Sequence, residues 1–194
     1  MTEPTEPTKA GESTAARRPW VVLVGPPGSG KSTIGAELAD RSGTELWDTD
    51  AAVEAAQGRS ISDIFVDDGE AAFRLLERQE VLRALEAHDG VLALGGGAVM
   101  TPDVADALRA PRHRQTVVFL DVGIADAASR VGFDASRPLL VVNPRASWNR
   151  LMKARRTTYE ELASVHVDTA GRSVSDIVDE IQRLAPALPP SGEA

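Results

Sequence analysis

The sequence of 194 residues contains no cysteine. Disulfide bonds, thiolate nucleophiles and cysteine-ligated metal centres are therefore excluded. The absence fits a reducing compartment, and the amino terminus also lacks the apolar core of a secretory signal peptide. No apolar run approaches the roughly 18 residues that a membrane-spanning helix needs. We therefore expect a cytoplasmic protein with no membrane partner.

Basic residues are too few to balance the acidic ones, because 21 Lys and Arg face 29 Asp and Glu, for a net charge of −8. Proteins that bind nucleic acid usually carry a basic footprint, so this balance argues against a nucleic-acid partner. The two ends also lack hydrophobic periodicity. We expect a disordered amino-terminal tail over residues 1–19, one domain over residues 20–184, and a carboxyl-terminal tail over residues 185–194.

The most informative stretch runs from Gly25 to Thr33 and fits the phosphate-binding pattern G-x-x-x-x-G-K-[ST]. Its glycines let the backbone turn with N–H groups pointing inward, and the following helix adds its positive end. A buried apolar run at 20–24 precedes it and an amphipathic pattern at 34–39 follows it, which a chance glycine-rich turn does not explain. The predicted nucleotide-binding residues are Gly28, Ser29, Gly30, Lys31, Ser32 and Thr33.

Apolar runs alternate with helical patterns along the rest of the chain. The pattern predicts an α/β fold, namely a five-stranded parallel sheet with helices on both faces, like a P-loop nucleoside-monophosphate kinase. The expected strands are 20–24, 45–47, 91–94, 116–120 and 165–168. Residues 131–143 contain Gly132, Arg137 and Pro138 with little periodicity, which indicates a mobile lid.

Acidic and glycine-rich segments follow two of the predicted strands. Asp48 and Asp50 follow strand 45–47, and ligands bind at the carboxyl ends of strands in open parallel sheets. The alternative is a helix N-cap supplied by Thr49 or Asp50. Residues 95–97 are three glycines, which indicate a close approach of the backbone to another group, or else a flexible loop. A Walker-B carboxylate pair is absent at this place, so phosphoryl transfer to a bound small molecule is favoured over water activation.

Two groups of basic residues have alternative interpretations. Arg74 lies early in a helix predicted over 69–87, and from the residue pattern alone a solvated surface arginine is the favoured interpretation. Lys153, Arg155 and Arg156 cluster in a helix predicted to end near Ala163, where a solvated face is the alternative.

Together these segments resemble the shikimate kinase family over residues 20–184. The P-loop is common to many kinases, whereas the combination of the other segments is specific. The matching segments are Gly25–Ser32, Asp48–Asp50, Gly58–Ile61, Ile64–Phe65, Asp68–Glu70 with Phe73–Arg74, Leu94–Val99, Arg137–Leu140 and Arg155–Tyr159.

The resemblance implies transfer of the γ-phosphate of ATP to the 3-hydroxyl of shikimate, in chorismate and aromatic amino-acid synthesis. On the acceptor side, it implies that Asp50 holds the hydroxyls and accepts the proton. The resemblance also implies that Arg74 and Arg155 clamp the carboxylate, although the neighbouring Arg156 leaves the choice of the second arginine open. The backbone of Gly95, Gly96 and Gly97 lies against the ring.

On the nucleotide side, the resemblance implies that Ser32 and Asp48 hold Mg²⁺, Asp48 through water. Lys31 and Arg137 neutralise the transferring charge, so the implied catalytic residues are Lys31, Asp50 and Arg137. The resemblance further implies that Arg130 lies against adenine. Arg172 is a further nucleotide contact, but its loop lacks the proline often found there in this family.

Two rival functions remain at this point. Gluconate kinase is another small P-loop kinase for a hydroxy acid, but we do not expect it to combine these acidic, arginine and glycine segments. A nucleotide-dependent switch that binds other proteins is the second rival, and such a switch needs no pocket for a small acid. We expect a monomer that uses ATP and shikimate.

Overall fold

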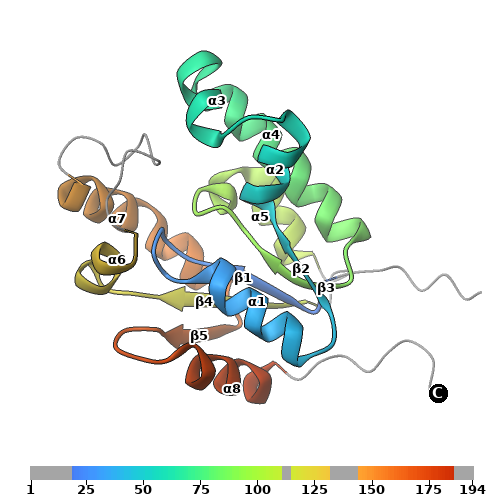
Figure 1. Ribbon diagram of the computed structural model, residues 1–194, viewed down its shortest axis with the longest axis vertical. Helices are drawn as coiled ribbons and strands as arrows, with labels where there is room; N and C mark the ends of the chain where they lie inside the picture. Colours follow the sequence, from blue (N-terminus) through green and yellow to red (C-terminus); the bar gives the residue numbers. More distant parts are fainter. Residues whose placement is uncertain (1–18, 111–114, 132–143, 186–194) are drawn as a thin grey trace, which may run out of the picture.

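The computed structural model describes residues 19–110, 115–131 and 144–185. Five strands form one sheet in the order β2-β3-β1-β4-β5, and every neighbouring pair is parallel (Figure 1). The strands are β1 Val21–Val24, β2 Glu45–Asp48, β3 Gly90–Ala93, β4 Thr116–Asp121 and β5 Val165–Asp168. The predicted five-stranded parallel sheet is therefore confirmed.

Eight α-helices and one short 3-10 helix accompany the strands within the described residues. They are α1 Lys31–Arg41, α2 Thr49–Gln57, α3 Ile61–Asp67, α4 Gly69–Ala87, η1 Ala98–Met100, α5 Pro102–Arg109, α6 Ile124–Val131, α7 Pro144–Leu162 and α8 Val174–Leu184. The predicted helix over 69–87 is found with the same ends.

The central strand β1 is apolar and buried on both faces, so its alternate residues belong to two separate cores. Val21 and Leu23 pack in the core formed with α1 and α8. Val22 and Val24 pack in the core formed with α4, α5 and α7. Side chains of a strand alternate between faces, so one continuous apolar run supplies both layers.

Helices α2, α3 and α4 enclose a third, smaller core, which holds Val53, Ile64 and Phe73. Figure 1 shows these three helices grouped together at one end of the molecule. Helix α2 carries Asp50, and α4 carries Arg74 and Glu77. This small core therefore positions charged side chains of the site.

The carboxyl ends of the strands all lie at one edge, because the strands are parallel. The P-loop follows β1, Asp48 ends β2, and the glycines at 95–97 follow β3. The order of strands places β1 in the centre, next to β3 and β4. The segments that the sequence singled out therefore meet at one edge of the sheet.

The structure assigns the cap of α2 to a different residue from the predicted alternatives. Asp48 is the N-cap, and its Oδ1 accepts hydrogen bonds from the backbone N–H groups of Asp50 at 3.0 Å and Ala51 at 3.3 Å. A cap supplied by Thr49 or Asp50 is therefore wrong. Asp48 precedes the helix and has an extended backbone, so its short side chain can accept from the N–H groups of the first turn. Thr49 and Asp50 already lie inside the helix and cannot do so.

The predicted tails and the predicted lid at 131–143 lie almost entirely outside the described residues. Within the described residues, we find no helix that is both long and apolar enough to cross a membrane.

Candidate active site

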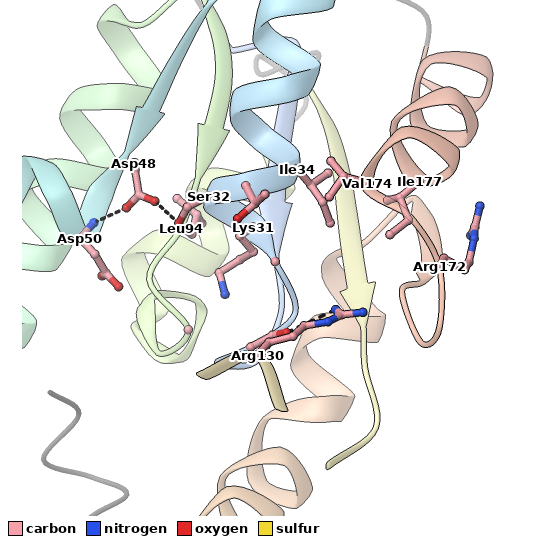
Figure 2. A pocket seen from close by; sticks show the side chains of 14 residues that line it. Lys31, Ser32, Ile34, Asp48, Asp50, Leu94, Arg130, Arg172, Val174 and Ile177 are labelled. Atoms are coloured by element: carbon pink, nitrogen blue, oxygen red, sulfur yellow. Dashed lines mark hydrogen bonds between the residues drawn. The ribbon is translucent and has the colours of Figure 1, made fainter. Parts of the chain in front are cut away.

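A cavity of about 560 Å³ opens where the strands end (Figure 2). It is lined by Gly28, Gly30, Lys31, Ser32, Thr33, Ile34, Asp48, Asp50, Leu94, Gly96, Arg130, Arg172, Val174 and Ile177. The cavity therefore joins the P-loop, the acidic segment, the glycine segment and the start of α8.

The P-loop shapes the nucleotide side of this cavity. Gly30 is the N-cap of α1 and has a φ of +90°, a conformation that residues with a side chain rarely adopt. The first N–H groups of a helix have no acceptor within it, and they favour an anion. The ammonium group of Lys31 donates to the carbonyl oxygens of Gly25 at 2.9 Å and Pro26 at 3.1 Å. Lys31 is thus held against the loop beside the cavity.

The residues predicted to hold a metal ion are in contact. The hydroxyl of Ser32 donates to Oδ2 of Asp48 at 2.5 Å, and both residues line the cavity. One hydroxyl and one carboxylate are the donors that suit Mg²⁺ carried by nucleotide phosphates, because such an ion keeps most of its ligands as phosphate oxygens and water. In the parts of the chain that the structure describes, no cluster of three or more His, Cys, Asp or Glu side chains offers a different metal site.

Arg130 lies along one wall of the cavity (Figure 2). Its guanidinium group donates to the backbone oxygen of Thr169 at 2.5 Å and to the hydroxyl of Thr169 at 3.0 Å. A longer bond of 3.5 Å joins it to the carbonyl of Gly28. Arg130 thus connects the loop after β5 to the P-loop, and the apolar side chains of Val174 and Ile177 line the same cavity.

Arg172 lies at the edge of the cavity with its charged end directed away from Lys31 (Figure 2). It forms an ion pair with Glu180 at 2.5 Å and donates to the carbonyls of Asp168 at 3.0 Å and Asp176 at 3.1 Å. These bonds join the loop after β5 to α8. In this arrangement the guanidinium group stabilises the loop, while its stem lines the cavity.

The glycine segment borders the cavity next to Asp50. The N–H of Gly95 donates to the buried hydroxyl of Thr49 at 2.9 Å. A side-chain carbon at Gly95 would lie 2.5 Å from Oδ1 of Asp50 and would also collide with Glu77. The carboxylates therefore pack directly on the backbone, which explains the need for glycine. The alternative of an unconstrained flexible loop is wrong.

Arg74 is paired and largely covered, so its interpretation as a solvated surface arginine is wrong. Its side chain is 23% exposed and forms ion pairs with Glu77 at 2.6 Å and Glu70 at 3.1 Å. A side-chain carbon at Gly97 would lie 2.6 Å from its Cζ atom. Burial acts to lower the pKa of Arg74, but the two carboxylates outweigh it, so the pKa is raised and the cation is retained.

Glu77 is a buried carboxylate that the sequence did not single out. Its side chain is 2% exposed, and its burial raises its pKa above the usual range, although the Arg74 guanidinium partly offsets this. The charge of Asp50 acts in the same direction as burial. A signal was present, because Glu77 stands four residues from both Phe73 and Val81 on the buried stripe of α4. A carboxylate in such a stripe needs a partner, and Arg74 stands three residues earlier.

Arg155 and Arg156 lie next to each other on α7 but face opposite environments. Arg155 is 9% exposed and donates from Nη1 to the carbonyl of Gly96 at 3.0 Å. The side chain of Arg156 is 46% exposed and pairs with Asp121 and Glu160. Lys153 is exposed as well. The solvated-face interpretation is therefore right for Lys153 and Arg156 and wrong for Arg155.

Comparison with known proteins agrees with this geometry. The family model described as shikimate kinase matches residues 27–185. A shikimate kinase of Streptomyces coelicolor is 52% identical over 159 residues, which are 82% of this chain and 91% of that protein. The chain belongs to the shikimate kinase family. The resemblance found from the sequence is thereby confirmed.

Solved structures support the same assignment of the fold. The structure titled shikimate kinase from Acinetobacter baumannii in complex with shikimate has a TM-score of 0.81 at 33% identity, covering 87% of this chain and 92% of that one. A gluconokinase from Sinorhizobium meliloti has a TM-score of 0.51 at 22% identity, with 88% and 95% covered. That second likeness shows only a shared fold. The family and the fold class are thus those expected from the sequence.

Proposed function

We infer that this protein transfers the γ-phosphate of ATP to the 3-hydroxyl of shikimate, which yields ADP and shikimate 3-phosphate. The observation that carries this inference is the convergence of a P-loop and a charged acceptor site at one cavity. Asp50 lines that cavity, and Arg74 and Arg155 contact the glycine segment beside it. An anionic polyol needs guanidinium groups for its carboxylate and a carboxylate for its hydroxyls. The reaction belongs to chorismate and aromatic amino-acid synthesis.

The chemical step is an in-line displacement. The 3-hydroxyl oxygen of shikimate forms a bond to the γ-phosphorus, while the bond from that phosphorus to the bridging oxygen breaks and ADP leaves with the electron pair. We propose that Asp50 orients the hydroxyl and accepts its proton. Lys31 and the first turn of α1 stabilise the negative charge that spreads over the phosphoryl oxygens. Arg130 and Val174 form the walls against which the base lies.

A Mg²⁺ ion bound with the nucleotide would supply charge neutralisation to its phosphates. Ser32 and Asp48 are the residues of this chain that would hold it, Asp48 through water. The hydrogen bond between their side chains supports the assignment, because it holds a hydroxyl oxygen and a carboxylate oxygen side by side in two residues that line the cavity.

Arg137 lies outside the described residues, so its role rests on the sequence alone. We propose that it enters the site when the lid closes and neutralises charge in the transition state. A cytoplasmic location and a monomeric state likewise stay predictions from the sequence.

An assay of ADP release tests the function directly. Shikimate and gluconate are supplied side by side with MgATP, and phosphorus NMR identifies the product. We expect turnover with shikimate and at most a background rate with gluconate. Equal rates of ADP release with and without an acceptor would favour a nucleotide-dependent switch. Faster ADP release with gluconate than with shikimate would show that the acceptor has been assigned wrongly.

A further inference from the structure

One face of α7 carries a buried stripe of mixed chemistry. Trp148, Met152, Arg155, Tyr159 and Leu162 recur at intervals of four and three residues and are all buried. This spacing places them on a single side of the helix. Most such stripes are purely apolar. This one contains three hydrogen-bond donors, so the acceptors that they reach need an explanation.

Tyr159 and Arg155 donate to the same acceptor, the carbonyl oxygen of Gly96. The phenol ring stacks on Phe119 with centroids 5.2 Å apart, which fixes its direction. Burial raises the pKa of Tyr159 to about 12, so the hydroxyl keeps its proton at neutral pH and remains a donor. Two donors therefore hold one carbonyl of the substrate-side loop.

Trp148 reaches the other loop of the site. Its indole N–H donates to the carbonyl of Pro27 in the P-loop at 3.0 Å, and the ring is buried. In a planar trans peptide the following N–H points the opposite way from the carbonyl. Fixing the Pro27 carbonyl toward α7 thus directs the N–H of Gly28 away from α7, and Gly28 lines the cavity.

The two acceptor carbonyls belong to loops that touch each other. A side-chain carbon at Gly96 would lie 3.4 Å from Cδ of Pro27 and 3.5 Å from the carbonyl oxygen of Gly25. The face of α7 therefore spans the line where the phosphate-binding loop meets the substrate-side loop. A helix bonded to both can fix their separation.

We propose that Trp148 and Tyr159 are positioning residues that fix the P-loop and the Gly95–Gly97 loop relative to each other from one face of α7. Trp148 acts through the Pro27 carbonyl on nucleotide binding, and Tyr159 acts through the Gly96 carbonyl and Arg155 on acceptor binding. The second half rests on the proposed function, whereas the first half concerns any nucleotide that the P-loop binds. Misalignment of reacting groups lowers a rate steeply, so both residues affect turnover without touching a substrate.

Two variants remove the donors and keep an aromatic side chain. Tyr159→Phe loses only the hydroxyl, whereas Trp148→Phe loses the N–H and also replaces the indole with a smaller ring. Trp20→Phe is the control for the first. Trp20 is buried at the opposite edge of the sheet, and its ring nitrogen has no hydrogen-bond partner among the described residues. Ser164→Ala is the control for the second, because the Ser164 hydroxyl donates to the Val117 carbonyl at 3.3 Å, also at the opposite edge. Calorimetry measures ADP and shikimate binding, and steady-state kinetics measures KM and kcat.

We expect the effects to divide between the two ligands. Trp148→Phe should weaken ADP binding by about fivefold and shikimate binding by less than about twofold, and Tyr159→Phe should do the reverse. Both should lower kcat, and neither control should change any of these values by more than about twofold. If Trp148→Phe does not fold, benzothienylalanine at position 148 removes the N–H and keeps the ring shape.

Variants that lose thermal stability but keep both affinities and kcat would reduce α7 to packing and overturn the inference. Unchanged ADP affinity in the position-148 variant overturns it even if the parent does not phosphorylate shikimate. An inactive parent, by contrast, overturns the proposed function and leaves the nucleotide half of this inference to be decided by the ADP measurement.

Discussion

The proposed nucleotide side and the proposed acceptor side of the site differ in composition. The nucleotide side consists mainly of backbone, namely the P-loop and the first turn of α1, with Lys31 as its cation. The acceptor side consists of charged side chains packed on glycine, with Asp50, Arg74 and Glu77 around the 95–97 segment. Backbone N–H groups at a helix start bind the phosphates of any nucleotide, whereas charged side chains with fixed directions favour one acceptor molecule. Substitutions on the nucleotide side should therefore lower turnover whichever acceptor is supplied. Substitutions on the acceptor side should weaken the binding of shikimate and leave the binding of ATP unchanged.

The largest effect should follow from Lys31→Ala. Removing a preorganised cation from the transferring phosphoryl group should lower kcat by at least about 100-fold. Arg41→Ala is the matched control, because Arg41 is a cation of the same helix that pairs with Glu37 and Asp179 away from the cavity. Steady-state kinetics with circular dichroism separates chemistry from folding. Turnover near that of the parent would mean that the nucleotide side has been assigned wrongly.

The next effect compares two neighbouring arginines on the acceptor side. Arg155→Ala removes a buried cation, which should cost about 2–5 kcal/mol of shikimate binding and leave ATP affinity unchanged. Arg156→Ala removes an exposed cation and should change neither affinity by more than about twofold. Calorimetry with shikimate measures both. Equal losses in the two variants would contradict the division of roles that their burial indicates.

A smaller effect should separate two adjacent glycines. Gly97→Ala introduces a carbon against the Arg74 guanidinium and should raise the shikimate KM by about tenfold, a cost of about 1.4 kcal/mol. Gly96→Ala places its carbon at ordinary contact distance from Pro27 and should be tolerated better. The φ of Gly97 is −106°, so its requirement for glycine comes from Arg74 and not from the backbone. A reversed order of KM values would refute this explanation.

The smallest effect concerns the stability of the acceptor side. Burial raises the folded-state pKa of Glu77, so its contribution to stability is present below the unfolded pKa of about 4.3 and is lost as pH rises through the folded value. Glu77→Gln has no such charge to bury. The melting temperature of the variant relative to the parent should therefore rise with pH across this range, by roughly 2–4 °C for each kcal/mol. A difference in melting temperature that stays constant with pH would show that Glu77 does not titrate in this pH range.

The sequence predicts the fold well because its strongest patterns are local. The apolar run of β1 needs no partner to be recognised, and the parallel sheet then brings Asp48, Asp50 and the glycines at 95–97 to one edge. The predicted ends of helix α4 agree with the structure because a continuous helical pattern runs from Gly69 to Ala87. The roles of Asp50, Arg74 and Arg155 in binding remain predictions that the geometry supports.

The sequence predicts less where an outcome depends on tertiary contacts. Adjacent residues of a helix point about 100° apart, so the choice between Arg155 and Arg156 depends on where α7 meets the sheet. The pairing of Arg172 with Glu180 depends on how the loop after β5 approaches α8. Such contacts leave no local periodic signal.

Asp48 has one further consequence, which concerns how this site can evolve. Its Oδ1 atom caps α2 while its Oδ2 atom faces Ser32, so one side chain contributes both to the stability of a helix and to the proposed metal site. Asparagine would preserve the cap and remove the charge, whereas glutamate would preserve the charge and lose the cap geometry. Each of these two replacements therefore keeps one of the two roles and loses the other. The cap of the helix that carries Asp50 and the oxygen proposed for the metal site therefore depend on the same side chain.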